Sequence, residues 1–273
     1  MDLKALNEAP PWDWPPNAGK LILEILADGQ ADAADRILAA ELAGDYTVID
    51  DELVEALLSV LNDSGELEDL RATAAISLGP ILDHADMDGF DDPDDTPISE
   101  DTFRKIQENL RRLYVDDALP KKVRRRILEA SVRAPQAWHQ EAVRAAYAQS
   151  DDDWNLTAAF AMRWVQGFNS QILEALASSD SDIHYQAICA AGNWELDAAW
   201  SHVSELVSAP DIEKPILLAA IDATASIRPL EAGRLLMDLT VSDDEDIVEA
   251  AHEALAMAAA RFQDEFDDDG DAR

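Results

Sequence analysis

Helix starts recur along this chain at intervals of about 31 residues. At five places an apolar run begins just after polar or capping residues, with steps of 31, 29, 33 and 31 residues between them: Val123, Trp154, Ile183, Ile216 and Ile247. Each interval also contains a second apolar run, so it predicts a pair of helices. Because one helical hairpin cannot bury both of its apolar faces alone, neighbouring hairpins must stack and share a core.

The periodicity inside these intervals is helical. Apolar residues that follow Ile247 recur at Ala250, Ala251, Ala254 and Leu255, offsets that place them on one face of a helix. The two-residue alternation of a β-strand is hard to find. We therefore predict an all-α fold, a right-handed α–α superhelix (solenoid) of roughly six to seven helical hairpins over residues 17–262.

One stretch carries a family resemblance. Residues 70–81 read LRATAAISLGPI, which resembles the first helix of the short HEAT-like repeats named after phycocyanobilin lyases, with an apolar-Arg start and an Ala-Ala-x-x-Leu-Gly close. A looser copy ends at Ala190-Ala191-Gly192, where small residues let neighbouring helices approach and glycine permits a left-handed helix end. The resemblance implies a HEAT-like α-solenoid, an architecture that serves many functions.

Three segments stand apart from the repeats. Residues 1–16 include two tryptophans among four prolines, and they predict an extended segment that docks its rings and caps the first hairpin. The step from Leu70 to Val123 is 53 residues, and the excess is an acidic insertion at 84–101, whose seven Asp with Gly and Pro predict a mobile loop. Residues 263–273 predict an acidic disordered tail.

The charge of the chain restricts its partners. There are 57 acidic and 21 basic residues, a formal net charge of −36, which disfavours nucleic acid and anionic membranes as partners. Asp outnumbers Glu by 37 to 20; helix capping explains part of this excess, and a salt-rich cytosol is a hypothesis for the rest. A single cysteine, Cys189, and the lack of a signal or transmembrane pattern predict a cytoplasmic protein.

Basic residues gather in one part of the chain. Residues 101–150 hold 11 basic and 6 acidic residues, and the candidate binding residues of this basic band are Arg104, Arg111, Lys121, Lys122, Arg124 and Arg125. The band could receive the protein's own acidic insertion, an acidic partner or phosphate groups. Alternatively, these side chains pair with neighbouring acids and have a structural role only.

Tryptophans supply the other candidate anchors. Trp138 and Trp200 are predicted to be exposed binding residues, and the remaining tryptophans of the repeats to pack in the core or between repeats. Trp154-Asn155 and Asn193-Trp194 resemble the Trp and Asn ladders with which armadillo proteins bind basic peptides, but their spacing does not repeat.

Three patterns raise the question of metal or catalytic chemistry. Residues 84–95 place Asp86, Asp88, Gly89, Asp92 and Asp95 as in an EF-hand loop, but the first ligand position is His84. His252-Glu253 resembles one of the His-Glu pairs that hold iron in the HEAT-like deoxyhypusine hydroxylases, and no other histidine here is followed by Glu. Cys189 lies in an apolar stripe, as a core thiol does. We predict no catalytic, cofactor-binding or metal-binding residue.

These observations favour a non-enzymatic scaffold or adaptor that binds a protein partner through the solenoid surface. The partner is expected to be basic, or to offer an extended or helical segment. Two alternatives stay open: an enzyme or metal-dependent lyase on a HEAT-repeat scaffold, and an acidic nucleic-acid mimic that binds a basic protein.

Overall fold

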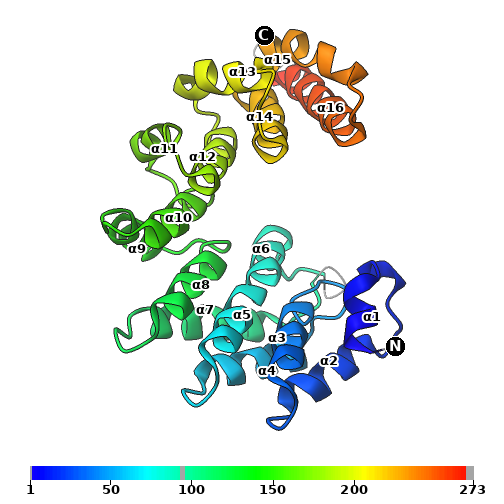
Figure 1. Ribbon diagram of the computed structural model, residues 1–273, viewed down its shortest axis with the longest axis vertical. Helices are drawn as coiled ribbons and strands as arrows, with labels where there is room; N and C mark the ends of the chain where they lie inside the picture. The colour runs from blue at the N-terminus through cyan, green and yellow to red at the C-terminus, as the bar shows by residue number, and fades with distance from the viewer. Residues whose placement is uncertain (1, 93–95, 269–273) are drawn as a thin grey trace. The chain divides into compact units, whose positions relative to one another are not determined.

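The chain folds into successive α-helices joined by short turns (Figure 1). The computed structural model describes residues 2–92 and 96–268, the last seven of these by their backbone alone. Within those ranges there is no β-strand, so the prediction of an all-α chain is confirmed. The chain divides into two compact units, residues 1–139 and 140–273, with the division falling at the start of one helix.

The first unit is built from three helical hairpins and two extra helices. In chain order its helices are α1 (Leu3–Glu8), α2 (Ala18–Ala27), α3 (Ala33–Leu42), α4 (Asp51–Asn62), α5 (Glu68–Ser77), α6 (Gly79–Asp88), α7 (Glu100–Tyr114) and α8 (Lys121–Ser131). Helices α3, α5 and α8 pack on one another in series, and α2, α4 and α7 cover them in a second layer. One continuous apolar cluster lies between the layers, from Leu3 to Ala134. Neighbouring hairpins therefore share their core, as the repeat predicts.

The second unit repeats the same plan. Its helices are α9 (His139–Tyr147), α10 (Asp152–Ala161), α11 (Asn169–Ala175), α12 (Ser181–Asn193), α13 (Trp200–Ser208), α14 (Lys214–Ile227), α15 (Pro229–Leu235) and α16 (Glu245–Asp268). Helices α10, α12, α14 and α16 pack in series, and α11, α13 and α15 each pair with the helix that follows. In the part of the chain that the structure describes, six such pairs of neighbouring helices pack together, within the predicted range.

The helix starts follow from local chemistry. Helices α8, α10, α12, α14 and α16 begin two residues before the five apolar residues singled out in the sequence. Several starts are capped by an aspartate whose carboxylate accepts backbone N–H groups, among them Asp32, Asp50, Asp151, Asp180 and Asp244. These caps satisfy amides that have no partner within the helix, which accounts for part of the aspartate excess.

Arginine closes the hairpins of the first unit. The fourth residue of each inner helix there is an arginine whose Nε–H donates to the carbonyl oxygen ten residues earlier, at the end of the preceding outer helix: Arg36 to Leu26, Arg71 to Leu61, and Arg124 to Tyr114. Arg36 also pairs with Glu66 through both terminal nitrogens, at 2.7 and 2.8 Å. The arginine of the apolar-Arg pattern thus links the two helices of one repeat through a hydrogen bond to the backbone.

Small residues let the inner helices approach, but the helix end at Gly192 is not left-handed. A Cβ atom added to Gly192 would lie 3.0 Å from Cα of Ala223 in α14, so close approach is what this glycine permits. The left-handed residue is Glu195, with φ of 49°. The prediction about the glycine's backbone was therefore wrong, because the helix continues past it before turning.

The acidic insertion is more ordered than its composition suggests. Residues 84–88 are the last turn of α6, and α7 already begins at Glu100. Between them, Thr96 and Ile98 are buried, and the Ser99 N–H donates to Asp51 in α4 at 2.8 Å. Residues 93–95 lie outside the described residues. The expected loop over 84–101 is thus reduced to the connection between two helices.

Both ends also differ from the expectation. Within residues 1–16, α1 is helical and buries Leu3 and Leu6 against α2 and α3, so the segment is not extended throughout. At the other end α16 continues to Asp268, into the predicted tail. The remaining tail residues, 269–273, are not among those described.

Candidate functional site

The basic band of the first unit is largely neutralised by its own neighbourhood. Lys105 of α7 pairs with Glu55 of α4, and Lys122 of α8 pairs with Asp69 of α5 at 2.7 Å. The other pairs join Arg104 to Glu100, Arg124 to Asp117 and Arg125 to Glu129. Lys121 is exposed at the start of α8, and Arg111 is exposed with no partner among the described residues. These contacts favour the local-pairing alternative over a continuous basic surface.

Two of the predicted residues meet in one cluster. The Arg124 guanidinium lies 5.5 Å from the centre of the Tyr114 ring, and the Tyr114 and Trp138 rings are 5.2 Å apart. Trp138 is half-buried, and its indole N–H donates to the Gln136 side chain at 2.8 Å. Trp138 therefore packs a loop against the end of α7 rather than standing free as an anchor.

Trp200 belongs to the second unit. It is half-buried, with the Arg228 guanidinium 5.4 Å from the centre of its ring. It lines a shallow groove of about 520 Å³ between α13 and α15, together with Glu205, Glu231 and Arg234. The side chain keeps a solvent-facing edge in a groove, although it is less exposed than the sequence predicts.

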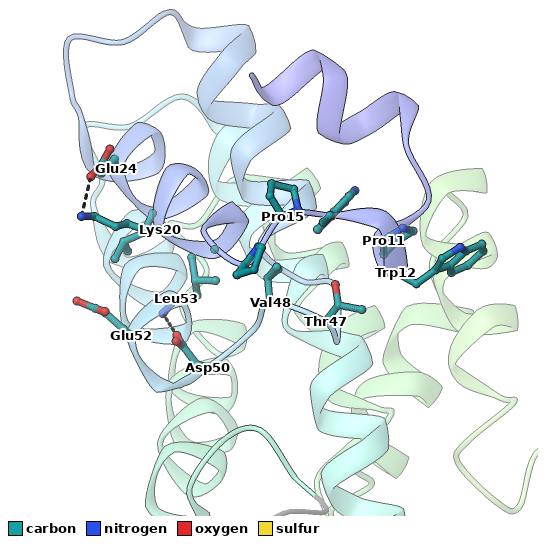
Figure 2. Close-up of a pocket in the computed structure, with 14 residues that line it drawn as sticks. Pro11, Trp12, Pro15, Lys20, Glu24, Thr47, Val48, Asp50, Glu52 and Leu53 are labelled. Carbon is teal, nitrogen blue, oxygen red and sulfur yellow. Dashed lines mark hydrogen bonds and ion pairs between the residues drawn. The ribbon is translucent and has the colours of Figure 1, made fainter. Parts of the chain in front are cut away.

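A larger groove lies in the first unit, where the N-terminal segment crosses α2 and the start of α4 (Figure 2). Its volume is about 650 Å³, and its walls come from residues 11–16, 19–24, 47–50 and 52–53. In Figure 2 the ring of Trp12 stands at one end, Lys20 and Glu24 lie at the other, and Pro15 and Val48 lie between them. The groove is therefore elongated, with an aromatic end and a charged end.

Trp12 is held in the open by its neighbours. Residues Pro11–Asp13 form a 3-10 turn, and the Trp14 indole N–H donates to the carbonyl oxygens of Leu6 at 2.9 Å and Ala9 at 3.1 Å. Prolines around the turn restrict the backbone further. With Trp14 docked, Trp12 projects outward and is 80% exposed. Covering about 150 Å² of such a ring would contribute about 4 kcal/mol, which makes Trp12 a preorganised contact.

The rest of the groove is acidic. Glu24, Asp50 and Glu52 line it against a single base, Lys20. Lys20 lies 3.8 Å from Glu24, with both side chains mostly exposed, so this pair is weak and can exchange partners. Asp50 accepts the Leu53 N–H at 2.9 Å and caps α4, whereas Glu52 has no partner among the described residues. A cationic group entering the groove would meet uncompensated negative charge.

Sequence reasoning identified this segment but not the site. It predicted that both indoles of Pro10–Pro16 would dock, and only Trp14 does so. The available sequence signal was the tight turn between Trp12 and Trp14, about which one ring docks and the other faces outward. The acidic wall comes from residues 24 to 52, whose approach to Trp12 depends on how α2 and α4 pack.

The catalytic and metal patterns find little support in the geometry. The EF-hand-like spacing is broken, because His84, Asp86 and Asp88 lie in helix α6 and not in a loop. Among the described residues no group of three or more His, Cys, Asp or Glu side chains is placed to hold a metal ion. Burial raises the pKa of the Cys189 thiol, with Arg163 opposing, so the thiolate form of a nucleophile is disfavoured.

Comparison with known proteins gives structural neighbours only. No family model matches the chain, and no curated protein matches it. Solved structures that are similar include an archaeal HEAT-like repeats protein from Thermococcus onnurineus NA1, with 15% identity, TM-score 0.43, and coverage of 90% of this chain and 99% of that one. The complex of CpcE and CpcF of phycocyanin lyase from Nostoc sp. PCC7120 shows 17% identity, TM-score 0.46, and coverage of 93% and 98%. Human deoxyhypusine hydroxylase shows 17% identity, TM-score 0.41, and coverage of 94% and 88%.

The order and packing of the helices agree with the HEAT-like repeats that the sequence predicts. Paired helices whose inner members stack in series are present within each unit. The neighbours differ in what their names say they do, a lyase and a hydroxylase among them, so they leave the activity of this chain open. No helix in the described ranges combines the length and apolar character needed to cross a membrane.

Proposed function

We propose that this chain is a non-enzymatic scaffold that binds other proteins, and that the groove beside Trp12 receives an extended basic segment of a partner. The observation that carries the proposal is the combination of an 80% exposed tryptophan, on a turn anchored by Trp14, with a wall of three carboxylates. Exposed tryptophan on a rigid support is typical of binding hot spots.

Charge complementarity decides the kind of occupant. A Lys or Arg side chain can lie on the Trp12 ring through a cation–π contact and pair with Glu24 or Glu52. An acidic segment would be repelled both by these carboxylates and by the net charge of −36. An extended segment suits an elongated groove, because successive side chains can reach its aromatic and its charged end.

The non-enzymatic part of the proposal rests on the raised pKa of the Cys189 thiol, which disfavours a thiolate nucleophile. A reducing, cytoplasmic location is also part of the proposal, and it rests on the single cysteine.

A labelled peptide of about 12 residues that alternates Lys or Arg with Leu and Pro tests the groove by fluorescence anisotropy with the full chain. We expect saturable binding at about 0.1 M KCl, and none for the same peptide with Glu in place of the bases. Trp12→Ala should weaken binding about tenfold or more, and Glu52→Gln by a smaller factor that shrinks as salt increases.

Val241→Ala is the matched control, because Val241 is 81% exposed in the second unit and does not line the groove. Equal affinity of Trp12→Ala and Val241→Ala for the basic peptide would contradict the proposal. Binding that disappears entirely at about 1 M KCl in the unaltered chain would assign it to charge alone and not to the groove.

A further inference from the structure

Two histidines of the second unit point their Nε2 atoms toward each other. His184 lies in the first turn of α12 and His202 in the first turn of α13, and their Nε2 atoms are 2.8 Å apart. The ring centres are 5.0 Å apart, and the ring planes meet at 66°. At this distance one Nε2–H donates to the lone pair of the other Nε2. At least one of the two rings must therefore be neutral.

Both rings are accessible to an ion. Each histidine is half-buried, so water and small ions reach the pair from outside. The contact between the two Nε2 atoms requires at least one neutral ring. A neutral imidazole is the form that offers a lone pair to a metal ion.

We propose that His184 and His202 together bind a divalent d-block ion such as Zn²⁺ through their Nε2 atoms, and so clip α12 to α13. Zinc lies about 2.0–2.1 Å from imidazole nitrogen, which for a tetrahedral ion places the two nitrogens about 3.4 Å apart. The rings need to separate by only about 0.6 Å to reach that spacing, a small rotation for half-buried side chains.

Metal binding requires one imidazole to change its tautomer. The ring that donates in the free pair moves its proton from Nε2 to Nδ1, so both Nε2 lone pairs face the ion and no net proton is released at neutral pH. Water completes the coordination shell on the exposed side. Imidazole favours zinc, copper and nickel, whereas magnesium and calcium prefer oxygen ligands, which separates this site from the acidic surface.

The ion would act on one connection of the fold. Residues 194–199 join α12 to α13 and include the left-handed Glu195, so the chain turns sharply between two successive helix pairs. Binding to the folded chain but not to an unfolded chain would stabilise this part of the second unit.

Calorimetric titration of the full chain with ZnCl₂ at pH 7.5, in about 0.5 M KCl to screen the carboxylates, tests the site. We expect one ion per chain, and His184→Ala or His202→Ala should each weaken its binding at least tenfold. His252→Ala is the matched control, because His252 is exposed on α16 and has no partner among the described residues. Mg²⁺ at equal concentration should give no saturable heat.

Nuclear magnetic resonance supplies a readout that needs no substitution. The chain has five histidines, and Zn²⁺ should shift the imidazole signals of His184 and His202 alone. Equal zinc affinity in His184→Ala, His202→Ala and the unaltered chain would show a diffuse ion atmosphere and overturn the proposal. Zinc shifts spread evenly over all five histidines would overturn it as well.

Discussion

The buried ring of His139 shows how a single residue can make the stability of the chain depend on pH. It is 1% exposed, its Nδ1 accepts the Gln136 N–H at 2.8 Å, and its Nε2 lies 3.0 Å from the Ser131 hydroxyl oxygen. Because Nδ1 is an acceptor, Nε2 carries the proton and donates it to Ser131, whose own hydroxyl donates to Leu128. Burial lowers the pKa of His139 to about 4.

His139 should make the free energy of unfolding sensitive to acid. Above pH 6.5 the ring is neutral in both the folded and unfolded chain, so it adds no pH dependence. As the pH falls from 6.5 toward about 4, the unfolded chain takes up the proton first, and the free energy of unfolding drops by up to about 3 kcal/mol. Urea unfolding at pH 7 and pH 4.5 measures the drop.

His139→Gln is the control for that step, because an amide can donate to Ser131 without titrating, while all carboxylates remain. The unaltered chain should lose more stability between the two pH values than His139→Gln does. Identical losses would show that carboxylates alone govern the acid response.

At the scale of elements, close approach between inner helices decides where glycine is needed. A Cβ at Gly44, just after α3, would overlap the carbonyl oxygen of Ser77 at the end of α5. Gly44→Ala should therefore push the first two repeats apart and cost about 2 kcal/mol of unfolding free energy. Denaturant unfolding followed by circular dichroism gives this value.

Gly29, in the turn between α2 and α3, is the matched control, since nothing lies within 4 Å of its added Cβ and its φ is not positive. Gly29→Ala should be neutral or slightly stabilising. If the two alanine variants were equally stable, contact between α3 and α5 would not depend on the glycine.

Helices were predicted correctly where neighbouring residues determine them, and were misjudged where tertiary contacts determine them. The five starts were placed within two residues, since capping and the apolar period are both written in neighbouring positions. Helix α6 was missed, because Asp86 and Asp88 suggest a loop by composition. It is helical because Ile81, Leu82 and Ala85 are buried and the helix packs on α8, a contact across about 45 residues.

At the scale of the whole molecule, charge is the dominant feature. Each described aspartate cap and ion pair uses one carboxylate, yet the net charge of −36 leaves many exposed acids that repel one another. Salt screens this repulsion, because the Debye length falls from about 30 Å at 0.01 M to about 3 Å at 1 M.

Raising KCl from about 0.01 M to about 1 M should therefore raise the melting temperature of the chain by several degrees. Differential scanning calorimetry measures the change, with sucrose at matched osmolality as the control for general solute effects. A constant or falling melting temperature would reject both the repulsion argument and adaptation to a salt-rich cytosol.

The amino-acid sequence by itself determined the all-α class, the repeat of about 31 residues and the helix starts, since these depend on apolar spacing and caps within a few residues. Tertiary packing alone decided which side chains meet. The basic band looked like a surface, but two of its bases, Lys105 and Lys122, pair across helices with acids about 50 residues away. Trp12 lies near acidic side chains, and His184 contacts His202, only because separate helices pack against one another. The direction of a side chain at such a contact depends on tertiary packing, which no local sequence pattern encodes.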